Sequence, residues 1–309
     1  MVFGATGFVG SWTVRALAAA GHDAIAVHRP SSDPWRLQGV PVRRAPSMSD
    51  GWAGLIARES PDCIVALDWE GVSASERDQE SIQSGNIGRQ AALLRAAEES
   101  DVGRVVGVGS QAEYGPIDTR TSEQTPTSPV TAYGRAKVQA FEQLVRVREA
   151  ADRSWVWARV FSVFGPLDSD RTLFPSIADA AASGTRLTIR EARQGWSHLY
   201  ASDAGTALAA LATNSSAEGV YNVAHPEAPP LRDSISLFTD YLGGATALEF
   251  ALNKAAVPPR LAGDTSRLEA LGWVASVELA TGLELTARWL SGLPVADPFD
   301  PSRTLPGRR

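Results

Sequence analysis

Residues 4–10 read GATGFVG, and this G-x-x-G-x-x-G spacing decides the fold of the 309-residue chain. The stretch lies between a short strand predicted at Met1–Phe3 and a helix predicted from Phe8 to Ala20, where apolar residues recur at helical spacing. Glycines in such a turn let a pyrophosphate approach the backbone at the helix N-terminus. A glycine triplet alone also occurs in ordinary turns, but this position favours a dinucleotide-binding unit. Because only three residues precede Gly4, either the natural start lies a few codons upstream or the first strand is short.

Short apolar runs alternate with helical stretches through the first half of the chain. The run Asp62–Leu67 (DCIVAL) is typical of a strand buried on both faces of a sheet. This alternation predicts an α/β fold of the Rossmann type, a doubly wound parallel sheet with helices on both faces. The remaining strands are expected at 24–28, 104–109 and 155–162, and the helices at 81–99 and 132–151.

The second half is less regular and predicts a smaller, C-terminal substrate-binding region. Helices are expected there at 173–182, 202–212, 232–241 and 277–290. We assign residues 1–165 to a Rossmann domain that is completed by about 195–223, and residues 166–194 and 224–291 to the substrate-binding region. Residues 292–309 contain four prolines and a charged end, so we expect a mobile C-terminal tail.

Composition and charge exclude several classes of protein. The chain is 44% hydrophobic and carries a net charge of −6 without basic blocks, which argues against nucleic acid or an anionic membrane as a partner. It has no apolar run of about 18 residues and no basic segment of a signal peptide. We therefore expect a cytoplasmic protein. One cysteine, Cys63, and four scattered histidines predict no metal site and no disulfide framework.

The end of the second predicted strand indicates which dinucleotide is bound. An acidic residue at this position usually holds the ribose 2′-hydroxyl of NAD. This chain has His28-Arg29 instead, and an arginine can pair with the 2′-phosphate of NADP. We therefore predict NADP(H) as the cofactor. The alternative is that Arg29 is a solvated loop residue.

Tyr133 and Lys137 form a Tyr-x-x-x-Lys pair on the helix predicted at 132–151. Their i,i+4 spacing places both side chains on one face. A phenol with a pKa of about 10 exchanges protons poorly near neutrality, and a nearby ammonium lowers that pKa. Ser110 follows the strand at 104–109, at the edge where open α/β sheets keep their sites. The three residues predict an acid–base site, whereas a surface Tyr–Lys pair and a turn serine are the alternatives for each part taken alone.

These residues together resemble the extended short-chain dehydrogenase/reductase family, in its nucleotide-sugar epimerase, dehydratase and reductase branch. The resemblance covers nearly the whole chain. Besides the glycine loop and YGRAK at 133–137, it rests on Asn86, GSQAEYG at 109–115, RVFSVFGP at 159–166, QGWSHLYASDAG at 194–205, GVYNVA at 219–224 and GW at 272–273.

The resemblance implies a role for each member of the acid–base site. Tyr133 is the expected acid/base, Ser110 orients the substrate oxygen, and Lys137 tunes Tyr133 and also holds the nicotinamide ribose hydroxyls. The expected cofactor-binding residues are Gly4, Thr6, Gly7, Phe8, Val9, Gly10, His28, Arg29, Leu67, Tyr133 and Lys137.

Several positions depart from the family pattern on the substrate side. Ser162 stands where many sugar-nucleotide members have Asn, and residues 196–198 (WSH) stand where many have Arg-Asp-Phe. An expected diphosphate or ribose contact is therefore missing, and Arg193 and Arg232 could replace it. The candidate substrate-binding residues are Asp68, Trp69, Gln111, Ala112, Ser162, Arg193, Trp196 and Arg232.

The resemblance predicts an NADPH-dependent ketoreductase of a nucleotide-activated 4-keto-6-deoxysugar. Gln111 and Ala112 stand where sugar 4,6-dehydratases have Asp and Glu, which disfavours dehydration, and Glu113 is expected to form hydrogen bonds rather than to act as an acid. The alternatives are a redox-neutral nucleotide-sugar 4-epimerase, a ketoreductase of another small natural product, and a dinucleotide-binding sensor without turnover. Members of the family often dimerise, which here would involve the helices at 81–99 and 132–151.

Overall fold

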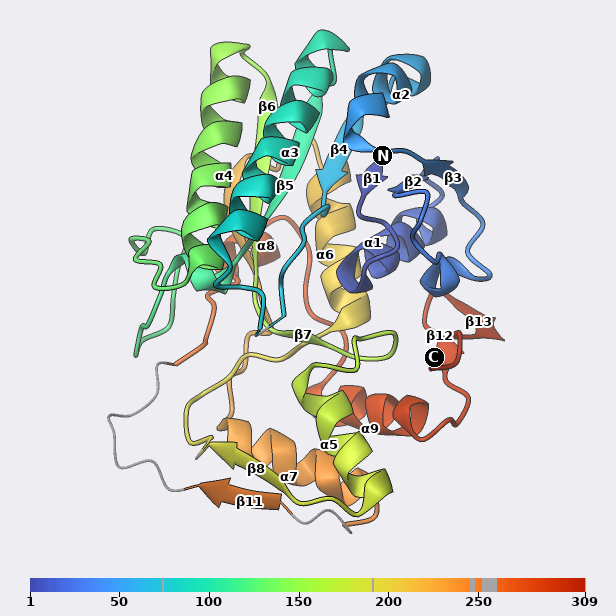
Figure 1. Cartoon of the computed structure of the whole chain (residues 1–309), viewed down its shortest axis with the longest axis vertical. Helices are drawn as coiled ribbons and strands as arrows, with labels where there is room; N and C mark the ends of the chain where they lie inside the picture. Colours follow the sequence, from blue (N-terminus) through green and yellow to red (C-terminus); the bar gives the residue numbers. More distant parts are fainter. Residues whose placement is uncertain (74, 191, 245–247, 252–259, 309) are drawn as a thin grey trace.

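A seven-stranded parallel sheet forms the centre of the protein (Figure 1). The computed structural model describes residues 1–73, 75–190, 192–244, 248–251 and 260–308. Across the sheet the order is β10-β6-β5-β4-β1-β2-β3, so the predicted doubly wound α/β fold is confirmed. The order reverses between β1 and β4, where such sheets bind their ligands. The strands are β1 (Val2–Phe3), β2 (Ile25–His28), β3 (Arg43–Pro46), β4 (Cys63–Ala66), β5 (Arg104–Ser110), β6 (Ser154–Val160) and β10 (Gly219–Val223).

Helices cover both faces of this sheet. Side chains along a strand alternate between the faces: Val156 and Ala158 of β6 pack on one side, and Trp157 packs on the other. No helix in the described ranges is long and apolar enough to cross a bilayer. The first face is covered by α1 (Phe8–Ala19) and α6 (Ala201–Thr213), and the second by α2 (Trp52–Glu59), α3 (Glu80–Glu99) and α4 (Ala132–Ala150).

The elements that the sequence predicts differ from the observed ones by at most two residues at either end. Two elements of the first half were not expected, β3 and α2. β3 has the sequence RRAP and lies at the edge of the sheet with mostly exposed side chains. Because its pairing buries almost no apolar surface, its sequence carries no strand pattern.

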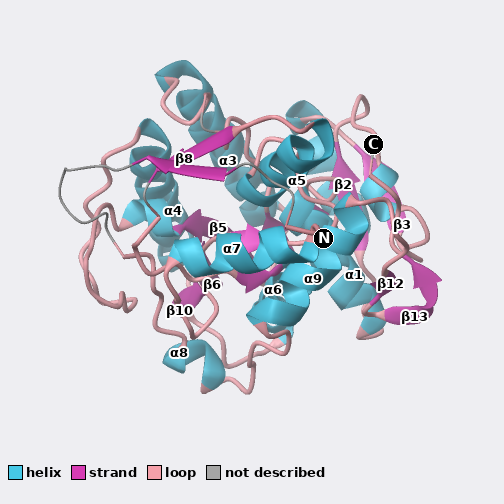
Figure 2. Ribbon diagram, turned by 90° about the horizontal axis from the view of Figure 1, so that it is seen from below, coloured by secondary structure: helices cyan, strands magenta, loops and turns pink. Residues whose placement is uncertain are grey.

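A smaller layer lies beyond the carboxyl ends of the strands (Figures 1 and 2). Its own core joins Phe164, Phe174, Ile235, Phe238 and Leu283. Its main elements are α5 (Leu173–Ser183), β8 (Leu187–Arg190), α7 (Leu231–Tyr241), β11 (Leu248–Ala251), which pairs with β8, and α9 (Leu279–Leu290).

Short elements connect these parts. β7 (Val163–Phe164) pairs with β9 (Leu199–Tyr200), and this pair links the end of β6 to the start of α6. The remaining short helices are η1 (Trp35–Leu37), η2 (Ser49–Gly51), η3 (Gln111–Glu113) and α8 (Ser266–Glu269).

The expectation of a mobile tail after residue 292 is wrong. The segment forms the hairpin β12 (Ala296–Asp297) and β13 (Asp300–Thr304), and Val295 and Leu305 are only 4% and 6% exposed. Its prolines prevent a helix, but Val295 and Leu305 still bury surface in one cluster with Trp12 of α1 and Trp289 of α9.

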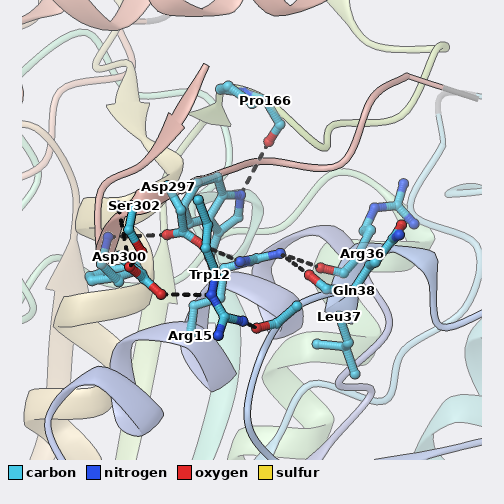
Figure 3. A network of polar contacts seen from close by, with 12 residues as sticks. Trp12, Arg15, Arg36, Leu37, Gln38, Pro166, Asp297, Asp300 and Ser302 are labelled. Carbon is cyan, nitrogen blue, oxygen red and sulfur yellow. Dashed lines mark hydrogen bonds and ion pairs between the residues drawn. The ribbon is translucent and has the colours of Figure 1, made fainter. Parts of the chain in front are cut away.

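A buried arginine fastens this hairpin to the nucleotide-binding half (Figure 3). The Arg15 guanidinium of α1 pairs with Asp297 and also donates to the carbonyl oxygen of Arg36 at 2.8 Å. Arg15 and Asp297 are 4% and 5% exposed. Each charge therefore depends on its partner, because neither can be hydrated.

Asp297→Asn should destabilise the protein by about 3–5 kcal/mol, because it leaves the Arg15 charge buried without its counter-ion. Denaturant unfolding measures the change. Asp23→Asn is the matched control, since Asp23 forms an exposed pair with Arg43 and its loss should hardly move the unfolding midpoint. Equal midpoints for Asp297→Asn and the wild type would contradict the anchoring role of this pair.

Candidate active site

The glycine loop joins β1 to α1 at the carboxyl edge of the sheet. Gly4 has a φ of +74°, and a Cβ there would lie 2.5 Å from the carbonyl oxygen of Leu67, so only glycine fits. No side chain caps α1 after Gly7, and the first turn of the helix holds no acidic residue. The first N–H groups and the positive end of the helix dipole are thus available to a phosphate. The loop fits the pyrophosphate of a dinucleotide.

The structure brings the three predicted acid–base residues together. Ser110 is the last residue of β5, and Tyr133 and Lys137 lie on the first turns of α4, which packs against β5. Ser110 and Tyr133 line the same cavity, and the Ser110 hydroxyl acts on the Tyr133 phenol to lower its pKa. Lys137 Nζ donates to the carbonyl oxygen of Val108 at 2.7 Å. Ser110 and Lys137 are 7% and 4% exposed. Ser110 and Lys137 are therefore shielded from water, whereas Tyr133 is half-buried at the place where a substrate oxygen could approach.

The N-terminus of α4 is fixed by three local contacts. Thr131 Oγ1 accepts a hydrogen bond from the Gly134 amide at 3.0 Å, and Asp78 Oδ1 accepts one from the Ala132 amide at 3.0 Å. A Cβ on Gly134 would lie 2.5 Å from the carbonyl oxygen of Ala112, so glycine is required where the helix approaches η3. Tyr133 is held beside Ser110 by this close packing.

Burial dominates the pKa values of Tyr133 and Lys137. It raises the pKa of Tyr133 to about 12, while the hydrogen bond with Ser110 and the charge of Arg77 act in the opposite direction. Burial lowers the pKa of Lys137 to about 7, against the charges of Glu113 and Asp68. The expectation that Lys137 draws the pKa of Tyr133 toward neutrality is wrong here, because desolvation of the phenolate outweighs the nearby charges. Tyr133 keeps its proton at neutral pH, which suits a proton donor.

Glu113 holds the end of β5 in place through buried hydrogen bonds. Its carboxylate is fully buried and accepts hydrogen bonds from the Ser110 amide at 2.8 Å, from Arg159 Nε at 2.8 Å and from Trp157 Nε1 at 3.1 Å. The prediction that Glu113 is a hydrogen-bonding partner is confirmed. Ser110 and Glu113 form a capping box, which folds residues 111–113 into η3.

The acid–base residues and the glycine loop line one cavity of about 480 Å³. Trp69, Gln111 and Ser162, which were predicted to bind substrate, contribute to its wall. Within the described ranges, no three His, Cys, Asp or Glu residues are grouped to hold a metal ion. The predicted cofactor residues in the wall are Gly4, Gly7, Phe8, Val9, Gly10, Leu67, Tyr133 and Lys137.

The other five predicted substrate residues lie outside that wall, and one of them, Asp68, lines a neighbouring cavity. Trp196 Nε1 donates to Ser162 Oγ at 2.7 Å, so it reaches the cavity through that residue. The Ala112 amide donates to Ser110 Oγ at 3.2 Å. The Arg232 guanidinium lies 4.5 Å from the centre of the Phe250 ring, and neither Arg232 nor Arg193 lines the cavity. The structure therefore does not bring these two arginines to the acid–base site.

A second cavity of about 400 Å³ adjoins the first one along the glycine loop and contains the predicted residues Thr6, His28, Arg29 and Asp68. Arg29 forms an ion pair with Glu70, which the sequence argument overlooked. That argument considered only the end of the second strand, whereas Glu70 follows β4 and Asp33 lies beyond the strand end. Both carboxylates line this cavity. Only the parallel packing of β2, β1 and β4 brings Glu70 beside Arg29.

Trp69 covers the amine of Lys137. Lys137 Nζ lies 3.6 Å from the centre of the indole ring, a close cation–π contact, and the indole meets the Tyr133 ring edge-on at 6.3 Å. Trp69 Nε1 donates to Gln83 Oε1 at 3.0 Å, which fixes the indole on the α3 side. Trp69 therefore forms an aromatic wall directly beside the acid–base pair.

Sequence reasoning missed three charged residues of the main cavity: Arg36, Arg77 and Asp168. Arg36 donates to the carbonyl oxygens of Leu167 at 2.7 Å and Thr6 at 3.3 Å, and so joins the glycine loop to the segment after β7. Burial raises the pKa of Asp168 to about 7. None of the three lies in a recognisable motif, so only their position in the fold reveals them.

Comparisons with known proteins agree with this site. A family model described as NAD dependent epimerase/dehydratase family matches residues 1–224. The 2′-dehydrokanamycin reductase of Streptomyces kanamyceticus is 32% identical over 227 residues, which make up 71% of this chain but only 59% of that protein. The dTDP-6-deoxy-L-talose 4-dehydrogenase (NAD(P)(+)) of Kitasatospora kifunensis is 26% identical over 265 residues, 80% of each chain.

Solved structures share the fold. The UDP-glucose 4-epimerase of Thermus thermophilus, in complex with NAD, superposes with a TM-score of 0.84 at 20% identity, over 94% of this chain and 98% of that one. The dTDP-glucose 4,6-dehydratase DesIV of Streptomyces venezuelae, with NAD bound, gives 0.82 at 23% identity, over 94% and 96%. Because the matching family model includes both the glycine loop and the acid–base residues, the chain belongs to the NAD dependent epimerase/dehydratase family of extended short-chain dehydrogenase/reductase enzymes, as its sequence resemblance predicts.

Proposed function

We propose that the protein is an NADPH-dependent ketoreductase acting on a nucleotide-activated 4-keto-6-deoxysugar. The observation that carries this proposal is that Ser110, Tyr133 and Lys137 line one cavity together with the glycine loop, with Tyr133 protonated at neutral pH. A protonated phenol in that place can act as a general acid toward a carbonyl oxygen. Bound NADPH supplies the hydride for such a reduction.

Each residue of the site has a distinct part in the proposed reaction. Ser110 Oγ holds the substrate oxygen, and Tyr133 donates its proton to that oxygen as negative charge develops there. The positive charge of Lys137 stabilises the phenolate that Tyr133 becomes. The carbonyl oxygen of Val108 holds the amine of Lys137 in place.

The side chains around Ser110 favour reduction over dehydration. Gln111 lines the cavity, and neither Gln111 nor Ala112 carries an acid or a base. The nearest carboxylate, Glu113, is occupied by Arg159, Trp157 and the Ser110 amide. A carboxylate bound in this way is a structural group, so it does not supply the second acid–base pair that elimination of water needs.

The proposed cofactor is NADP(H). Arg29 follows β2 and reaches the second cavity, where its side chain is 52% exposed and paired with Glu70. A 2′-phosphate carries more charge than one carboxylate and accepts two parallel hydrogen bonds from a guanidinium. In the proposed complex the 2′-phosphate therefore replaces Glu70 as the ion-pair partner of Arg29.

We propose that the two predicted parts of the chain bind different ligands. Residues 1–165, completed by 195–223, bind the dinucleotide; residues 166–194 and 224–291 bind the substrate, with 292–309 as the C-terminal tail. Asp168, Ser169 and Thr172 support this division, because they belong to residues 166–194 and line the main cavity together with the glycine loop. The proposed substrate contacts are Asp68, Trp69, Gln111, Ala112, Ser162 and Trp196. Arg193 and Arg232, which were predicted from the sequence, lie outside the main cavity and are not proposed to contact the reacting sugar.

Two other functions are supported by particular similarities. The fold neighbours named UDP-glucose 4-epimerase favour a redox-neutral 4-epimerase, which needs the same acid–base residues. The relative named 2′-dehydrokanamycin reductase favours a ketone substrate of another natural product. A sensor without turnover is disfavoured because it does not need the Ser110, Tyr133 and Lys137 group.

We also propose a cytoplasmic homodimer that pairs through α3 and α4. The two helices pack against each other on one face of the sheet (Figure 1). Such a pair can meet its copy as a four-helix arrangement with closed two-fold symmetry.

Reduction is tested with a panel of nucleotide 4-keto-6-deoxysugars and NADPH. One NADPH should be oxidised per sugar reduced, followed as loss of absorbance, and Tyr133→Phe should lower turnover at least about 100-fold while cofactor binding survives. Repeated turnover of a fully hydroxylated sugar nucleotide, without net change in nicotinamide redox state, would establish the epimerase instead. If a ketone without a nucleotide causes NADPH oxidation and no member of the panel does, the protein is instead a ketoreductase of another natural product.

The pH dependence of reduction should follow Lys137. Below its pKa of about 7 Lys137 carries the charge that stabilises the Tyr133 phenolate, and above it that charge is lost, so kcat/KM should fall as pH rises through neutrality. Tyr133 keeps its proton to far higher pH and does not limit this range. Lys137→Met should be slow at every pH and lose this dependence. A kcat/KM that rises above neutrality in the wild type would contradict the assignment.

Cofactor preference should depend on Arg29 and Glu70. Arg29→Glu should weaken NADPH binding by about 10- to 150-fold, the worth of a charged hydrogen bond of about 1.5–3 kcal/mol, and should erase or reverse the preference over NADH. Glu70→Gln should tighten NADPH, because the competing carboxylate is gone. Calorimetry measures both, with Arg43→Glu on the exposed strand β3 as the matched charge control. Tighter binding of NADH than of NADPH to the wild type would refute the proposal.

A further inference from the structure

Arg77 carries a positive charge at the active site, and the proposed acid–base reaction gives it no role. It lies on the segment between β4 and α3 and lines the main cavity. Its guanidinium carbon is 5.3 Å from the centre of the Tyr133 ring. Its charge is therefore placed within one side chain's length of the proposed proton donor.

The backbone of Arg77 is fixed relative to Tyr133. The carbonyl oxygen of Arg77 accepts a hydrogen bond from the Tyr133 amide at 2.8 Å, and the neighbouring Asp78 accepts one from the Ala132 amide at 3.0 Å. The Arg77 amide itself donates to the Ser73 carbonyl oxygen at 2.9 Å. The backbone of the arginine is thus attached to the first turn of α4, and its guanidinium lies over the Tyr133 ring.

The guanidinium of Arg77 has no counter-charge. No ion pair or side-chain hydrogen bond joins it to another of the described residues, and its Nε is shielded from water without a hydrogen-bond acceptor. Asp168, a carboxylate of the same cavity, is instead bonded to the Ser169 amide at 2.6 Å and to Thr172 Oγ1 at 2.7 Å. A partly buried cation without a partner is costly, and an arginine fork matches the oxygens of phosphate and carboxylate groups.

We propose that Arg77 is a specificity-determining residue that binds an anionic oxygen group of the sugar substrate, a phosphate of the nucleotide or a sugar carboxylate, and so places the ketone at Tyr133. The proposal rests on the proposed function. It also accounts for the departure at residues 196–198, since Arg232 stacks on Phe250 outside the cavity while Arg77 lies inside it.

A bound anion at Arg77 would also act on Tyr133. The charge of Arg77 favours the phenolate, in the direction opposite to burial. An anion that neutralises this charge removes that influence, so Tyr133 holds its proton more firmly once the substrate is in place. Because Tyr133 is protonated at neutral pH with or without this influence, the main effect of Arg77 in the proposal is to place the substrate.

The test measures binding without turnover. NADP⁺-saturated protein is titrated by calorimetry with UDP and, separately, with glucuronate, so that the two arms distinguish phosphate from carboxylate. Binding of at least one probe is expected, and Arg77→Gln should weaken it about 10-fold or more, the worth of a charge-assisted hydrogen bond, while Arg77→Lys restores part of it. Arg135→Gln is the matched control. Arg135 lies on the first turn of α4, to which the backbone of Arg77 is bonded, but its side chain is exposed and paired with Glu80.

The outcomes separate this proposal from the proposed function. Tyr133→Phe should bind the probe like the wild type, because binding needs no proton transfer, and a reducible anionic substrate should show a raised KM with Arg77→Gln and a smaller change in kcat. If no keto-sugar is reduced but the probe still binds through Arg77, the anion site stands and the ketoreductase fails. Equal affinity in wild type and Arg77→Gln, with NADP⁺ affinity retained as a check of folding, overturns the anion site, as does a wild type that binds neither probe.

Discussion

The buried carboxylate of Glu113 is the contact on which the active site depends. It joins the end of β5, through the Ser110 amide, to Arg159 and Trp157 of the neighbouring strand β6. Because the charges of Glu113 and Arg159 are both removed from water, separation of the pair would leave a charge without solvation. The contact folds η3, and η3 in turn receives the close approach of Gly134 on α4. The position of Tyr133 therefore depends on a carboxylate that takes no part in proton transfer.

Desolvation gives the cavity its chemical character. Desolvation keeps Tyr133 protonated and lowers the pKa of Lys137 to about 7. In a cavity whose titratable groups are driven toward their uncharged forms, the permanent charges of Arg36 and Arg77 remain, and that of Arg77 lies beside Tyr133. The uncharged phenol of Tyr133 thus lies beside the positive charge of Arg77. In the proposed reaction the charge orients an anionic substrate, and the phenol transfers a proton to the ketone.

The nucleotide-binding loop is linked to distant parts of the chain by arginines. Arg36 donates to carbonyl oxygens of Thr6 and Leu167, and its own carbonyl oxygen accepts a hydrogen bond from Arg15, which pairs with Asp297 (Figure 3). The glycine loop, the segment after β7 and the C-terminal hairpin thus share one network. A guanidinium can do this because it presents five donors in a fixed plane, so that it bonds several carbonyl groups and a carboxylate together.

Local pattern was enough to predict the sheet, the glycine loop and the Tyr133–Lys137 pair. Apolar runs alternate with helical periods in the first half of the chain, and an i,i+4 spacing defines a shared helix face regardless of what surrounds it. Other features were decided only by tertiary structure: the pairing of Arg29 with Glu70, the docking of the hairpin through Asp297, the place of Arg77 beside Tyr133, and the direction of the pKa shift of Tyr133. The physical reason is common to all four. Ion pairing and desolvation depend on which groups from separate segments exclude water together, and sequence spacing does not encode that distance.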